Sequence, residues 1–129
     1  MTEKAPGHFP RQVGIDAYGN GGFRFAEMSH RGSLLCLPGG MLGWDVTTPA
    51  EITLESLAPL LEVADDIDVL MVGLGHEITG LDPAVRDGLR AHGIIIEAIT
   101  TGSAVRTYNV LLGEHRAVAA ALIAVDRVR

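Results

Sequence analysis

Basic residues are scarce in this sequence. Lys4 is the only lysine, and 16 acidic residues outnumber 10 basic ones, so the formal net charge is −6. Proteins that hold nucleic acid gather Lys and Arg to neutralise phosphates and release counterions. The composition therefore argues against a nucleic-acid-binding protein.

Cysteine and long apolar runs are also lacking. Cys36 is the only cysteine, so no disulfide can form within the chain, and a reducing, intracellular location is compatible. The longest apolar run, at residues 117–125, falls short of the roughly 20 residues that cross a bilayer. The N-terminus has neither the apolar segment of an export signal nor the Arg-rich leader of a mitochondrial protein. We therefore expect a bacterial cytoplasmic protein without a membrane span.

The sequence does contain enough apolar material for a core. With 47% apolar and 20% charged residues, a chain of 129 residues can bury roughly two thirds of its unfolded surface. We expect a single domain at residues 13–129, preceded by a flexible tail at residues 1–12.

The N-terminal half has the pattern of antiparallel strands. Asn20-Gly21 supplies the positive φ values of a tight turn, so residues 13–18 and 23–27 are predicted to form a β-hairpin. Two more strands are predicted at residues 33–37 and 41–46. The N-terminal half is therefore rich in antiparallel pairing.

The C-terminal half alternates helices and strands. A Leu pattern predicts a helix at residues 53–64 with Thr53 as its cap, although Pro59 should kink or divide it. Strands buried on both faces are predicted at residues 67–72 and 93–99, because both are continuously apolar. Asp82-Pro83 opens a helix between them, and right-handed parallel crossovers follow from this order.

The last predicted helix begins after residue 100. Thr100, Thr101 and Ser103 can each accept a hydrogen bond from the first free N–H groups, and Gly102 lets the backbone turn sharply. Gly113 is predicted to stop this helix.

Three stretches carry a resemblance to a known family: IDAYGNGGFRF at residues 15–25, an apolar strand with a Gly-x-Gly end at 69–75, and TGSAVRTYNVLLGEHRAVAAAL at 101–122. In these the chain resembles the α/β family that includes mitochondrial NADH:ubiquinone oxidoreductase (complex I) assembly factor 3 and bacterial relatives. The Ala content of residues 116–125 alone favours helix. We predict a strand there, because a strand completes the alternation and because the resemblance implies one. It also implies a noncatalytic interaction or assembly factor, whose eukaryotic relatives are mitochondrial.

Together these elements predict a single three-layer α/β domain. Its mixed sheet is expected to be parallel in the C-terminal half and to be extended by the N-terminal β-hairpin.

One candidate site lies where the first buried parallel strand ends. Gly73, Gly75 and His76 occupy the carboxyl end of that strand, where open α/β sheets bind ligands. The dinucleotide pattern fails because Ile78 stands in place of the third glycine. Leu74 stands where many relatives are expected to have Thr, so a hydroxyl that could contact a ligand is absent. A purely structural turn and a small-ligand contact both remain open.

The second candidate is the helix start. Its free N–H groups and Arg106 could bind a carboxylate or phosphate. Alternatively, Arg106, Asn109 and Glu114 could form a structural cluster that fixes the helix against the sheet. The ligand-binding residues predicted on this basis are Gly73, Gly75, His76, Thr101, Gly102, Ser103, Arg106 and Asn109.

No catalytic residue, metal site or cofactor is predicted. His76-Glu77 begins like a zinc-protease helix, but Gly80 replaces the second histidine. We expect a protein that binds a protein partner, and a homo-oligomer is compatible. Trp44 is either a core residue or, if exposed, an interface anchor. The alternative is a small-anion or metabolite-binding protein or enzyme, with its site between the loop 73–76 and the helix start 101–106.

Overall fold

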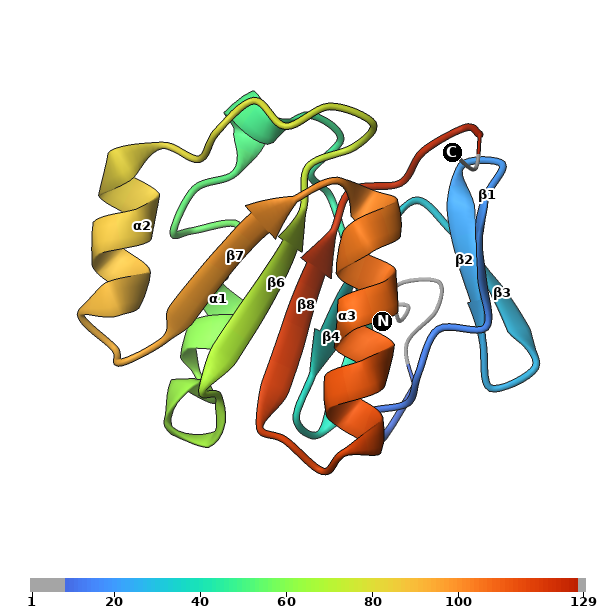
Figure 1. Cartoon of the computed structure of the whole chain (residues 1–129), viewed down its shortest axis with the longest axis horizontal. Helices are drawn as coiled ribbons and strands as arrows, with labels where there is room; N and C mark the ends of the chain where they lie inside the picture. Colours follow the sequence, from blue (N-terminus) through green and yellow to red (C-terminus); the bar gives the residue numbers. More distant parts are fainter. Residues whose placement is uncertain (1–8, 128–129) are drawn as a thin grey trace, which may run out of the picture.

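The computed structural model describes residues 9–127 and contains a five-stranded mixed sheet (Figure 1). Its strand order is β5-β4-β8-β6-β7. Strand β6 pairs in parallel with β7 and β8, whereas β4 pairs antiparallel with β5 and β8. The parallel C-terminal half is therefore confirmed. The five strands are β4 (Ser33–Leu37), β5 (Gly40–Trp44), β6 (Val69–Gly73), β7 (Ile95–Ile99) and β8 (Val118–Leu122).

The predicted N-terminal hairpin is confirmed as β1 (Ala17–Gly19) and β2 (Gly22–Phe25), with Asn20 and Gly21 at φ of 54° and 78°. The hairpin is not hydrogen-bonded to the mixed sheet. It pairs instead with β3 (Met28–Arg31), which the sequence did not predict, and forms a second antiparallel sheet of three strands.

Helices cover both faces of the mixed sheet. Helix α2 (Pro83–Arg90) and the short α1 (Ala58–Leu61) contribute to an apolar cluster on one face. On the other face, α3 (Thr101–Gly113) and the three-stranded sheet share a second cluster that contains Phe25 and Tyr108. Figure 1 shows α3 crossing in front of the sheet with β1–β3 beside it. The predicted three layers are thus confirmed.

The helix predicted at residues 53–64 is broken up. Pro59 falls in the first turn of α1, where its missing N–H is tolerated, so helical structure begins only at Ala58. Thr53 still acts as a local cap, because its Oγ1 accepts the Ser56 N–H at 3.0 Å. Two 3₁₀ turns flank this region, η1 (Pro49–Glu51) and η2 (Ala64–Asp66).

Strand β8 confirms the strand prediction for the Ala-rich segment. All five of its residues are buried at the centre of the sheet. The prediction that the segment after Gly93 is buried on both faces was wrong. Strand β7 lies at the edge of the sheet, and Ile95 is 65% exposed, since only its other face is packed.

Helix α3 ends at Gly113, but this glycine does not make the stop. The left-handed residue is His115, with φ of 63°. The N–H of His115 donates to the Leu112 carbonyl at 2.9 Å, and that of Arg116 to the Leu111 carbonyl at 3.0 Å. This pair of bonds is the Schellman motif, in which glycine is the usual left-handed residue.

The tail predicted at residues 1–12 lies partly outside the described residues, which begin at Phe9. Phe9 and Met41 exchange two backbone hydrogen bonds of 3.0 Å, and Gln12 Nε2 donates to the Val118 carbonyl at 2.8 Å. Phe9 is therefore held against β5 and Gln12 against β8.

Trp44 is a core residue. It is only 7% exposed, and its Nε1–H donates to the Ser56 carbonyl at 2.8 Å. The alternative role as an exposed interface anchor is therefore wrong.

Candidate functional site

The carboxyl end of β6 meets the start of α3 at very close range. A Cβ atom on Gly73 would lie 2.9 Å from Thr101 Cα and 3.1 Å from Leu122 Cδ2. Such contacts are too short for any side chain to fit without backbone movement. Gly73 is therefore explained by packing, as in the structural interpretation of the Gly-x-Gly turn.

Thr101 joins three segments with one hydroxyl. Its Oγ1 donates to the Ile123 carbonyl at 2.7 Å and accepts the Gly75 N–H at 3.0 Å. Its own N–H donates to the Gly75 carbonyl at 2.9 Å, and the side chain is fully buried. Thr101 therefore fastens the loop after β6 and the segment after β8 to the helix start, and its hydroxyl proton is already donated.

A small hollow lies between the loop after β6 and the start of α3. It measures about 90 Å³ and brings together predicted site residues from both segments. We call it the helix-start hollow. Its lining residues are Tyr18, Gly75, His76, Thr100, Gly102, Ser103, Arg106 and Val125.

Tyr18 was missed by the sequence analysis. It comes from β1, and a Cβ atom on Gly102 would collide with its hydroxyl, so the ring lies directly against the helix start. The IDAYGNGG stretch signalled the hairpin turn, but nothing in it shows that the tyrosine reaches a helix more than 80 residues later.

The helix start offers few free donors. The Thr101 N–H is taken by the Gly75 carbonyl, and the Ser103 N–H is capped by Thr100 Oγ1 at 3.4 Å. An anion at a helix start depends on such N–H groups being unpaired. The backbone contribution to an anion site is therefore small, and Arg106 would have to supply most of it.

Arg106 and Asn109 behave differently. Asn109 Oδ1 accepts the Ile15 N–H and its Nδ2 donates to the Ile15 carbonyl, both at 2.8 Å. Arg106 is exposed, and within residues 9–127 its guanidinium has no hydrogen-bonded or ion-paired partner. Glu114 is exposed as well. The predicted structural cluster is thus realised by Asn109 alone.

Tyr108 and Cys36 form a buried polar contact beneath α3. The Tyr108 hydroxyl donates to the Val13 carbonyl at 2.7 Å. Burial strongly raises the pKa of the Cys36 thiol, and burial together with Cys36 raises the pKa of Tyr108. Both groups therefore stay protonated in the folded protein, and a thiol in this state is a poor nucleophile.

Neither a metal-binding cluster nor a membrane-spanning helix occurs in the part of the chain that the structure describes. Within residues 9–127, no three His, Cys, Asp or Glu side chains are grouped so that they could hold a metal ion. None of the helices in that range has the length and apolar character needed to span a bilayer.

The geometry defines a two-sheet α/β protein in which Thr101 and Asn109 of α3 are bonded to backbone groups of distant segments. The chain belongs to the family described as proteins of unknown function (DUF498/DUF598), which matches residues 15–123. An uncharacterized protein of Rhodobacter capsulatus is 38% identical and covers 95% of this chain and 93% of its own length. A solved structure described as an outer membrane protein from Bartonella henselae is 52% identical, with a TM-score of 0.87 over 91% of this chain and 98% of that one.

Animal relatives are also found. The mouse NADH dehydrogenase (ubiquinone) 1 alpha subcomplex assembly factor 3 is 34% identical over 89% of this chain. This chain spans 62% of the length of that protein. The resemblance to the complex I assembly factor family is thereby confirmed.

Proposed function

We propose that this protein is a noncatalytic assembly factor that acts by binding a partner protein. The observation that carries the proposal is its likeness, over most of its length, to a protein described as an assembly factor. The candidate site supports the same conclusion, because Gly73, Thr101 and Asn109 are accounted for by packing or by backbone hydrogen bonds. A cytoplasmic location and self-association stay predictions.

Affinity purification of the full chain from its own cells tests the proposal. We expect a defined partner to be recovered in fixed ratio and to be cross-linked to the native protein but not to the heat-unfolded one. A cofactor-supplemented metabolite screen runs in parallel. Turnover that disappears on changing His76, Ser103 or Arg106 to Ala, with no partner recovered, would overturn the assembly role.

The second candidate function is the binding of a small anion at the helix-start hollow. Arg106 favours it, because its guanidinium is exposed at the rim and unpaired by any residue from 9 to 127. In that case phosphate or a carboxylate should raise the melting temperature of the native protein. Arg106→Ala should abolish this rise while leaving the melting temperature without anion nearly unchanged.

A matched control is Arg116→Ala, which removes an equally exposed arginine outside the hollow. If both variants respond to anions as the native protein does, no anion is bound at the hollow.

A further inference from the structure

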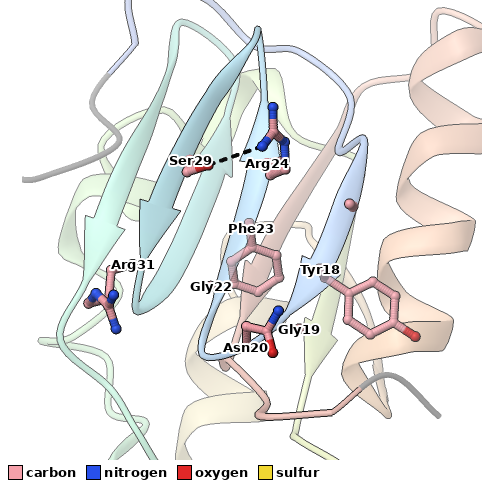
Figure 2. A pocket seen from close by; sticks show the side chains of 9 residues that line it. Tyr18, Gly19, Asn20, Gly22, Phe23, Arg24, Ser29 and Arg31 are labelled. Carbon is pink, nitrogen blue, oxygen red and sulfur yellow. Dashed lines mark hydrogen bonds between the residues drawn. The ribbon is translucent and has the colours of Figure 1, made fainter.

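The solvent-facing side of the three-stranded sheet contains a hollow that the helix-start site does not include. It measures about 390 Å³, and Figure 2 shows the side chains around it. We call it the arginine hollow. Its lining residues are Ala17, Tyr18, Gly19, Asn20, Gly22, Phe23, Arg24, Ser29 and Arg31.

Strand register explains why this face is hollow. Gly19 pairs with Gly22, and Gly22 pairs with Arg31, so one row across the sheet has a side chain on only one of its three strands. Because side chains alternate between faces, the next row on the same face is two residues away. That row is Ala17, Arg24 and Ser29. Small residues thus form a floor, and Arg24 of β2 and Arg31 of β3 extend from the same face.

The two glycines are fixed by backbone geometry. Gly19 has a φ of 123°, which disfavours side chains, and a Cβ atom on Gly22 would collide with the His30 carbonyl oxygen. The floor is therefore kept open by the fold of the hairpin itself.

The charge of this face is opposite to that of the whole chain. The formal net charge is −6, yet the lining of the arginine hollow, as described within residues 9–127, has two guanidinium groups and no carboxylate. Both arginines are exposed. Arg24 donates one long hydrogen bond of 3.5 Å to Ser29 Oγ, and Figure 2 shows Arg31 apart from that pair.

The spacing of the two arginines matches an extended acidic segment. Arg24 on β2 pairs with Ser29 on β3, and Ser29 is two residues before Arg31. Arg24 and Arg31 are therefore diagonal neighbours, which in an antiparallel pair are roughly 7–8 Å apart. Residues two apart in an extended chain point to the same side and are separated by about 6.6 Å. Two carboxylates with one residue between them can therefore each meet one guanidinium, which pairs well with carboxylates.

Strand β3, which contains Arg31, forms one edge of the small sheet. Strand β3 is the last strand of its sheet, and no strand among residues 9–127 pairs with its outer side. In Figure 1 this sheet lies at one end of the molecule, away from α2 and β7.

We propose that the arginine hollow docks an extended acidic segment of a partner protein, through two acidic residues separated by one residue. The inference rests on the assembly function proposed above and names the chemistry of its partner. The segment lies over the glycine floor, and its two carboxylates pair with Arg24 and Arg31.

The direct test is an NMR titration of the isotope-labelled full chain with a short peptide containing Glu-Thr-Glu in a Ser/Gly background, at low ionic strength. The amide signals of residues 17–31 should shift. Arg24→Gln/Arg31→Gln should weaken binding roughly threefold to thirtyfold, as expected for the loss of two exposed ion pairs. Arg90→Gln/Arg116→Gln makes the same charge change at exposed sites outside the hollow and should bind like the native chain.

Specificity is checked with two further probes. A Gln-Thr-Gln peptide should not bind, and inorganic phosphate should not reproduce the shifts. Equal binding of both peptides, equal loss in both double variants, or saturable binding of phosphate without binding of the acidic peptide would each overturn the proposal.

Affinity purification with the same variants separates this inference from the assembly function. Failure of Arg24→Gln/Arg31→Gln, but not of the control variant, to retain the partner recovered by the native chain supports docking at the arginine hollow. Equal recovery by all three chains overturns the hollow as the docking site and leaves the assembly function standing.

Discussion

One buried hydroxyl holds together the segments that meet at the start of α3. Thr101 Oγ1 is bonded to the Gly75 N–H and to the Ile123 carbonyl, and it is inaccessible to water. Buried backbone groups that lose such a partner are costly, since no water replaces the bond. The hydroxyl proton of Thr101 is therefore already used within the fold.

Replacing this hydroxyl by a methyl group should be strongly destabilising. Thr101→Val keeps the shape but leaves two backbone groups unpaired, so we expect the free energy of unfolding to fall by about 2–4 kcal/mol. Urea denaturation measures it. Thr101→Ser keeps the hydroxyl and should lose much less. Thr107→Val, at a half-buried position of α3, should change little. A loss below that of Thr101→Ser would contradict the role of the hydroxyl.

The buried thiol of Cys36 should make stability depend on alkaline pH. Burial raises its pKa in the folded state, whereas the unfolded thiol ionises with an ordinary pKa of about 8.5. Above that pH the unfolded state binds fewer protons than the folded state, so stability falls as pH rises, by up to about 1.4 kcal/mol per pH unit. Below it, this contribution is fully present.

Urea denaturation between about pH 8.5 and 9.5, below the ordinary pKa of tyrosine, measures this slope. Cys36→Ala should flatten the slope, whatever its effect on stability at neutral pH. An unchanged slope in the variant would show that the thiol ionises equally in both states.

At the scale of elements, the end of α3 is strained by its own sequence. His115 takes the left-handed position that ends the helix, which costs a residue with a Cβ roughly 1–2 kcal/mol. Gly113 could adopt the left-handed conformation without strain, but it lies two residues before that position. The helix is stopped here because the chain must turn into β8, whose pairing with β4 and β6 outweighs the strain.

His115→Gly should therefore stabilise the protein. We expect a gain of about 0.5–1 kcal/mol, since relief of strain is partly offset by the greater chain entropy of glycine. A rise in the urea midpoint with an unchanged slope measures it. Glu114→Gly is the control, because Glu114 has a φ of −91° and gains nothing from glycine. Equal effects of the two substitutions would argue against the left-handed strain.

The elements differ in how well the sequence predicted them. Asn20-Gly21 predicted the first hairpin, because both residues tolerate positive φ. The second hairpin was missed because its turn has Ala26 and Glu27 at φ of 50° and 64°, residues that carry no such signal. Packing of the flanking strands imposes this conformation.

At the scale of the whole molecule, the two sheets share one apolar cluster. Phe23 and Phe25 from the small sheet pack in the same cluster as Leu34 and Leu122 from the mixed sheet. The residues before β1 are fastened to α3 by Asn109 and to β8 by Gln12. The small sheet therefore has no separate core on which to fold.

We accordingly expect residues 9–127 to unfold as one unit. Calorimetry should give a single transition whose measured enthalpy equals the van't Hoff enthalpy. In a Tyr108→Phe background, Tyr18 of the small sheet is the only tyrosine. Its near-ultraviolet absorbance and the fluorescence of Trp44, in the mixed sheet, should change together. Trp44→Phe is the control that assigns the fluorescence. Two separated transitions would show that the sheets are independent units.

The sequence by itself determined the local elements with strong chemical signals. Thr100 as a cap, Asp82-Pro83 as a helix start, the Asn20-Gly21 turn and the order of buried strands follow from backbone preferences and from apolar patterns. These signals depend on neighbours in the chain, so they can be interpreted without knowing the fold.

Only the tertiary structure decided what the polar residues do. Thr101, Arg106 and Asn109 look alike as candidates, but one is buried between two strand ends, one is exposed, and one is bonded to Ile15, which is 94 residues away along the chain. The arginine hollow likewise depends on register across three strands. Burial and long-range pairing fix these roles, because a polar side chain is free for a ligand only when it is not already hydrogen-bonded to a distant backbone group.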